Sequence, residues 1–211
     1  MSHGNELNAL HPSVAPTPSL LWRGNNPTGT SGMMAVDKVG GAALFFNPTD
    51  LSEIASIAIP GAHEMVISPD HTLGYIAQFG KWGRNAAGLG ALLEPAYMIW
   101  VIDLASHHVV TRIDTYPNVG PHGMKFDLEG NLWVTFESNA LGMVDTKQHK
   151  LVEVWPLGEP QQPPRTLEIS DDGTKLYCSG KGDDIIVFDH SSRKVRTRIP
   201  LPSGATSLTA A

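Results

Sequence analysis

Three features of this sequence predict an all-β fold built from repeated four-stranded antiparallel sheets. The 211 residues include 21 Gly and 16 Pro, a composition that favours frequent turns and short strands over long helices. Apolar runs that end in Asp recur along the chain, and Asp103, Asp145 and Asp189 stand roughly 43 residues apart. Polar and apolar residues alternate after each of these positions, which is the period of a half-buried strand.

Each repeat is expected to contain a β-hairpin around its Asp or Asn. The first strand is an apolar run, and these runs lie at residues 42–46, 98–102, 141–144 and 185–188. The second strand is the segment that follows, at residues 54–59, 109–113, 151–155 and 195–199. A side chain of Asp at the end of a strand can accept hydrogen bonds from the backbone of the next turn, so each pair is predicted to form a hairpin.

A second pair of strands precedes the hairpin in three of the repeats. Its first strands align without a gap, at residues 62–67, 121–126 and 164–169. After a turn, its second strands follow at residues 73–77, 132–136 and 175–179. Four antiparallel strands in about 43 residues is close to the length of one propeller blade. We therefore predict a β-propeller of four-stranded antiparallel blades over residues 34–211, with about four repeats present.

Two segments depart from the repeat. Residues 1–33 contain Pro12, Pro16, Pro18 and Pro27 and almost no periodic apolar pattern, so they are predicted to form an extended N-terminal arm. Residues 81–95 are inserted between the second and third strands of one blade. Their Gly and Ala content favours a flexible loop or one short helical turn, and loops of this length are often functional.

Charge and hydropathy exclude several classes of partner. The 15 Lys and Arg against 21 Asp and Glu give a net charge of -6, so no nucleic-acid partner is expected. No stretch approaches the roughly 18 apolar residues of a membrane span. The single cysteine, Cys178, cannot close an internal disulfide. The chain as given carries no signal-peptide pattern, so we expect a cytoplasmic location, or export if its start is truncated.

Several motifs resemble those of a known propeller family. They are Ser-Asp-Asp-Gly at residues 170–173, Ile-Ile-Val-Phe-Asp at 185–189 and Lys-Val-x-x-x-Ile-Pro at 194–200. This pattern resembles the YVTN-repeat, lactonase-like seven-bladed propellers, and residues 121–158 also resemble blades of virginiamycin B lyase. Seven blades need roughly 300 residues. The chain is therefore expected to be a fragment, to close as four or five blades, or to complete its ring as a homo-oligomer.

Side chains at the start of the innermost strands are predicted to meet at the central channel. In the aligned repeats these are His63, His122 and Arg165, with Glu64 beside the first. Imidazoles and a carboxylate could hold a divalent metal or act as general acid and base. The structural alternative is that these side chains cap backbone carbonyls and hold adjacent blades together.

Glu137 follows the predicted strand 132–136 and is expected near the same opening. The resemblance to virginiamycin B lyase implies a His and a Glu around a bound Mg²⁺, and His122 and Glu137 are the best matches to that pair. The catalytic candidates are therefore His63, His122, Glu137 and Arg165. The metal-ligand candidates are His63, Glu64, His122 and Glu137, with Mg²⁺ or Ca²⁺ as the expected ion.

Two functions from different classes follow from these candidates. The first is binding of a small-molecule ligand at the central channel, with metal-assisted hydrolase or lyase chemistry. The second is a non-catalytic interaction scaffold, which would hold a protein partner with the propeller face and the insertion at residues 81–95. The aligned channel residues favour the first, and the lack of a complete catalytic constellation in the sequence favours the second.

Overall fold

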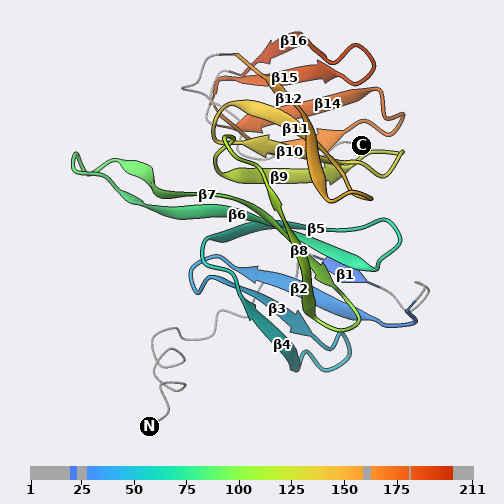
Figure 1. Cartoon of the computed structure of the whole chain (residues 1–211). Coiled ribbons are helices and arrows are strands. Elements are labelled where there is room, and N and C mark those ends of the chain that lie inside the picture. Colours follow the sequence, from blue (N-terminus) through green and yellow to red (C-terminus); the bar gives the residue numbers. More distant parts are fainter. Residues whose placement is uncertain (1–19, 23–27, 159–162, 181, 202–211) are drawn as a thin grey trace.

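Four separate four-stranded sheets account for all the strands in the described part of the chain (Figure 1). The computed structural model describes residues 20–22, 28–158, 163–180 and 182–201. Within each sheet the strands follow sequence order, and every neighbouring pair is antiparallel. This arrangement confirms the predicted all-β fold of propeller blades. Among the described residues, no helix is long and apolar enough to cross a membrane.

The blades are numbered here from the N-terminus. Blade 1 contains β1 (Leu20–Trp22), β2 (Gly32–Asp37), β3 (Ala42–Phe46) and β4 (Glu53–Ala58). Blade 2 contains β5 (Ala62–Ile67), β6 (Leu73–Arg84), β7 (Gly90–Asp103) and β8 (His108–Asp114). Blade 3 contains β9 (Pro121–Phe126), β10 (Leu132–Phe136), β11 (Ala140–Asp145) and β12 (Lys150–Pro156). Blade 4 contains β13 (Pro164–Ile169), β14 (Lys175–Gly180), β15 (Asp184–Asp189) and β16 (Lys194–Pro200).

The repeated Asp residues shape the turns that follow their strands. The Asp103 carboxylate accepts hydrogen bonds from the backbone N–H of Ala105 and Ser106, at 3.1 and 2.7 Å. Asp189 accepts one from the Ser192 N–H at 2.8 Å, and this bond is the largest of the causes that lower the pKa of Asp189 to about 2. The predicted role of these residues as turn acceptors is confirmed.

Apolar side chains fill the space between neighbouring blades. One buried cluster joins blades 1 and 2, a second joins blades 2 and 3, and a third joins blades 3 and 4. In the third cluster the Trp133 indole is fully buried, stacks on Trp155 at 5.3 Å and meets Phe188 of blade 4 edge-on at 6.0 Å. Burial of these faces against one another fixes the blades side by side.

The prediction of a loop or helical turn at residues 81–95 is wrong. Strands β6 and β7 continue through this segment as a paired hairpin, in which Lys81 faces Glu94 and Trp82 faces Leu92. The hairpin closes through a turn in which Gly88, with φ of +75°, donates to the Asn85 carbonyl. Backbone pairing between the two strands outweighs the low strand propensity of Gly and Ala. The resulting extension, residues 80–96, is called the arm; it projects away from the blades (Figure 1).

The first sheet begins before residue 34. Strand β1 pairs with β2 with Leu20 opposite Met34, so this sheet includes part of the segment that was expected to be an extended arm. Residues 1–19 and 23–27 of that segment lie outside the described residues.

Candidate functional site

The innermost strands β5, β9 and β13 carry His63, His122 and Arg165 at their second positions. Gly123 allows β9 to approach β13, because a Cβ atom at this glycine would lie 2.6 Å from the backbone oxygen of Arg165. The rings of His63 and His122 are 4.0 Å apart between centroids. The structure therefore brings together residues that occupy equivalent positions in successive repeats.

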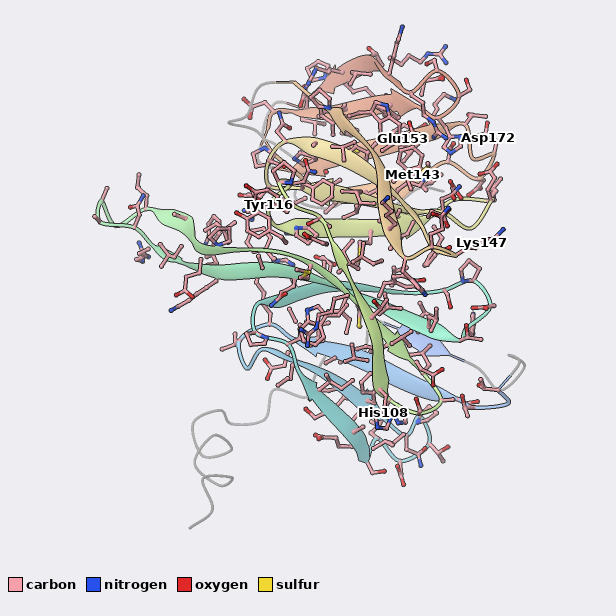
Figure 2. The ribbon with its side chains drawn as sticks, viewed as in Figure 1. His108, Tyr116, Met143, Lys147, Glu153 and Asp172 are labelled. Carbon is pink, nitrogen blue, oxygen red and sulfur yellow. The ribbon has the colours of Figure 1, made fainter. Side chains whose placement is uncertain are left out.

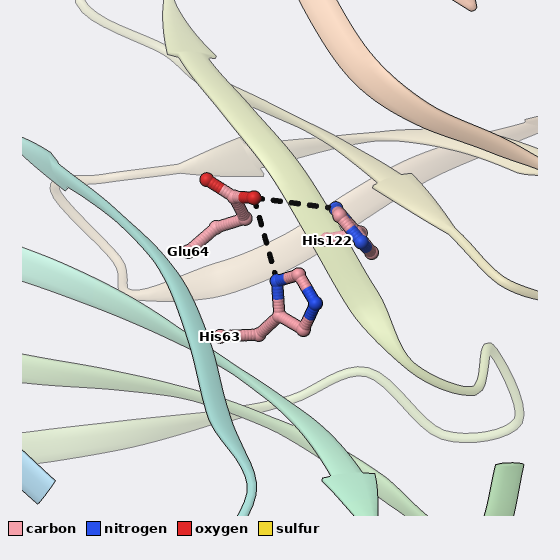
Figure 3. Close-up of side chains that lie close together, drawn as sticks. All are labelled: His63, Glu64 and His122. Atoms are coloured by element: carbon pink, nitrogen blue, oxygen red, sulfur yellow. Dashed lines mark ion pairs between the residues drawn. The ribbon is translucent and has the colours of Figure 1, made fainter. Parts of the chain in front are cut away.

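Glu64 joins the two histidines in a compact cluster (Figure 3). Its Oε1 lies 3.4 Å from Nδ1 of His63 and 3.7 Å from Nδ1 of His122. Both Nδ1 atoms are buried and have no hydrogen-bond partner. One nitrogen from each ring and one oxygen of the carboxylate all lie within 4.8 Å of one another, as ligands of a single ion would.

His122 is the most deeply buried member of this cluster, with only 4% of its surface exposed. Burial, together with the charges of His63, Arg165 and Lys38, lowers the pKa of His122 to about 2. A hydrogen bond with the Arg165 backbone acts in the opposite direction. The ring is therefore neutral at pH 7, with Nδ1 facing Glu64.

Arg165 and Glu137 form an ion pair beside this cluster, close enough for the charge of Arg165 to act on His122. A guanidinium nitrogen of Arg165 lies 3.1 Å from a carboxylate oxygen of Glu137, which follows β10. The guanidinium also lies over the rings of Phe79 and Trp82, at 5.8 and 5.0 Å from their centroids. Glu137 thus pairs with Arg165, and it does not belong to the cluster of His63, Glu64 and His122.

Lys38 is a member of the site that the sequence analysis missed. It lies in the turn between β2 and β3, and its ammonium group contacts Nε2 of His63. Burial lowers the pKa of Lys38, and the charge of Arg165 lowers it further. A signal for Lys38 exists in the sequence: it directly follows Asp37 at the end of the second strand of its blade, as Glu137 directly follows Phe136.

A second group of potential ligands consists of Asp127, Glu129 and His190. Here the Asp127 carboxylate already accepts hydrogen bonds from the Trp133 indole at 2.8 Å and the Asn131 amide at 3.0 Å. His190 of blade 4 lies 3.4 Å from the same carboxylate. The Asp127 oxygens therefore already contact donors from two blades. This group holds blades 3 and 4 together and is a weaker candidate for a metal site.

Comparison with known proteins supports the fold. No protein-family model matches the chain, and no curated protein matches it. Among solved structures, the chain is similar to hydrazine synthase of Kuenenia stuttgartiensis, with 18% sequence identity and a TM-score of 0.66. The match covers 95% of this chain and 53% of that one, so the chain spans about half the length of the protein it resembles. At this identity the similarity shows a shared propeller-like fold and carries no activity across.

Proposed function

We propose that this protein binds a divalent metal through His63, Glu64 and His122 at the mouth of the channel, and acts there on a small molecule. The observation that carries the proposal is the pair of buried Nδ1 atoms that have no hydrogen-bond partner and lie next to one carboxylate oxygen. Buried polar atoms of this kind are uncommon and call for a partner. A bound cation would satisfy both; His63 would then carry its proton on Nε2, and the Lys38 ammonium would turn away from that nitrogen.

Two of the three distances between the donors are close to those around a tetrahedral ion. Two ligand atoms at 2.0–2.2 Å from Zn²⁺ stand roughly 3.3–3.6 Å apart. The distances of 3.4 and 3.7 Å from the Glu64 oxygen to the two nitrogens lie close to this range. Imidazole ligands favour Zn²⁺ or a similar transition metal, whereas Mg²⁺ and Ca²⁺ prefer oxygen. We therefore favour Zn²⁺ over the Mg²⁺ or Ca²⁺ expected from the sequence.

The hydrogen bond between the His122 ring and the Arg165 backbone also fits metal binding. A histidine ligand commonly uses its second ring nitrogen to bond a carbonyl or carboxylate, which fixes the orientation of the ring. The close approach of β9 and β13 at Gly123 holds this bond in place. His122 is thus oriented before any ligand arrives, which lowers the entropic cost of binding.

The reaction that this site fits best is metal-assisted hydrolysis or elimination. A bound Zn²⁺ would polarise an oxygen of the substrate or lower the pKa of a bound water. Glu137 faces the same opening and is held in place by Arg165 at 3.1 Å, which suits it to exchange a proton with the substrate. The motifs that resemble those of lactonase-like propellers, and the blade that resembles virginiamycin B lyase, would fit this class of reaction.

A second candidate function is the protein-interaction scaffold, and the arm is the observation that favours it. The arm projects from the blades and exposes Leu89 and Leu93 with 66% and 45% of their surface accessible. Exposed apolar side chains on a projecting hairpin are typical of a contact with another protein. Metal analysis separates the two functions, since the scaffold needs no metal.

The metal proposal is tested by the zinc content of the purified protein after removal of metal by chelation and addition of Zn²⁺. We expect one equivalent of zinc for the wild-type protein, and a loss of affinity of about 100-fold or more in His63→Ala. The matched control is His108→Ala, at the start of the outer strand β8 and at the opposite end of blade 2 (Figure 2). Equal zinc content in the two variants, or none in the wild-type protein, would contradict the proposal and favour the scaffold.

A further inference from the structure

A groove of about 800 Å³ lies next to the candidate metal site, between blade 1 and the root of the arm. Its lining includes Lys38 and Gly40 from the β2–β3 turn, Pro60, and Gln78, Lys81 and Trp82 from β6. This volume is in the range of sites that bind small molecules. The groove is separate from the metal cluster, because His63, Glu64 and His122 are not among the residues that line it.

The groove is continuous with the channel site through two shared residues. Lys38 lines the groove and also contacts Nε2 of His63. Trp82 lines the groove, and its ring also lies 5.0 Å from the Arg165 guanidinium. A molecule that lies in the groove would therefore contact two side chains that in turn contact residues of the candidate site.

Two residues of the groove wall, Gln78 and Gly80, are held in place by neighbouring groups. Gln78 is held at both ends, since its amide nitrogen donates to the Pro60 carbonyl at 2.9 Å and its oxygen accepts from the Trp100 indole at 3.1 Å. Gly80 has φ of +108°, and a Cβ atom there would lie 2.2 Å from the Glu94 backbone oxygen. Glycine at this position lets the two strands of the arm meet closely at its root. A preformed wall lowers the entropic cost of binding.

The charges at this end of the groove are suited to an anion. Lys81 is already paired with Glu94 at 2.8 Å. By contrast, no carboxylate among the described residues forms an ion pair with Lys38. Arg165 uses one terminal nitrogen for Glu137, but its Nε atom is buried without a hydrogen-bond partner. Of these cations, Lys38 both lines the groove and has donors left for a negatively charged ligand, whereas the Arg165 Nε lies outside the groove lining.

We propose that the groove binds a small organic anion, with its acidic group at Lys38 and a planar or apolar body against Trp82. Lys38 and Trp82 would then determine which molecules reach the site. This inference rests on the proposed function, because it names the class of ligand on which the bound metal would act. Phosphates, sulfonates and carboxylates share the chemistry that Lys38 would recognise.

The test uses 2-naphthoate as the anionic probe and 2-naphthylmethanol as its neutral counterpart, each titrated into the zinc-loaded protein and followed by NMR. We expect Lys38→Gln to lower the affinity for 2-naphthoate by about tenfold and to leave the affinity for 2-naphthylmethanol unchanged. Trp82→Ala should lower the affinity for both probes by about threefold to tenfold. The matched control is Lys147→Gln, in the β11–β12 turn at the other end of blade 3, which should bind both probes as the wild-type protein does.

The zinc content of each variant is measured in the same samples, so that failures of the two proposals can be told apart. Zinc bound at one equivalent with no binding of 2-naphthoate, or equal affinity for it in Lys38→Gln and Lys147→Gln, would overturn the groove proposal alone. Binding of 2-naphthoate that depends on Lys38 in a protein that takes up no zinc would overturn the proposed function and support the groove as a ligand site.

Discussion

Replacement of Trp133 by alanine is expected to lower the free energy of unfolding by about 3–5 kcal/mol, the largest effect on stability that we predict. The Trp133 indole is fully buried, stacks on Trp155 and touches Phe188 of the next blade. Its removal would leave a cavity at the interface of blades 3 and 4. It would also leave the buried Asp127 carboxylate without its 2.8 Å hydrogen bond from the indole nitrogen.

Chemical denaturation measures this effect, and Trp82→Ala is the control because it makes the same change on the arm. Trp82 is 38% exposed and its removal leaves no closed cavity, so we expect a smaller cost of about 1–2 kcal/mol. Similar losses of unfolding free energy in the two variants would show that packing between blades 3 and 4 contributes little to stability.

Replacement of His122 by leucine is expected to cause a large loss of metal affinity. We expect zinc affinity to fall by about 100-fold or more, because one of three ligands is lost. Unfolding free energy should fall by no more than about 2 kcal/mol, since leucine removes a buried nitrogen that has no hydrogen-bond partner but leaves the Arg165 backbone without its bond. A functional histidine can be replaced in this way without harm to the fold.

If these histidines instead serve to hold adjacent blades together, the opposite result is expected. If His122 mainly holds blade 3 against blade 4, His122→Leu would lower the unfolding free energy by well over about 2 kcal/mol and leave zinc binding intact. Denaturation and zinc titration of the same preparation distinguish the two roles.

The blades could be predicted from the sequence, because the same pattern of strands and turn residues recurs in each blade. An Asp at a strand end, such as Asp103 or Asp189, accepts backbone hydrogen bonds in the following turn wherever it occurs. The contact of His63 with His122 could be predicted for the same reason, since equivalent positions in neighbouring blades become neighbours in space. Alignment of the repeats was therefore enough to place both side chains on one side of the fold.

The features that the sequence did not predict depend on contacts outside the repeated pattern of strands and turns. The predicted pairing of Glu137 with His122 was replaced by an ion pair with Arg165, because the chain after β10 reaches the next blade. Lys38 was missed because it lies in a turn, where no strand periodicity marks the direction of a side chain. The arm was missed because its strands are stabilised by pairing with each other, which composition alone does not reveal.

The convergence of donors from neighbouring blades on one metal ion is tested most directly by a crystal of the zinc-loaded protein measured at the zinc absorption edge. We expect one anomalous peak roughly 2.0–2.2 Å from nitrogen atoms of His63 and His122 and from an oxygen of Glu64. A peak at Asp127 and His190 instead, or no peak at the channel mouth in a protein that contains zinc, would contradict the proposed site.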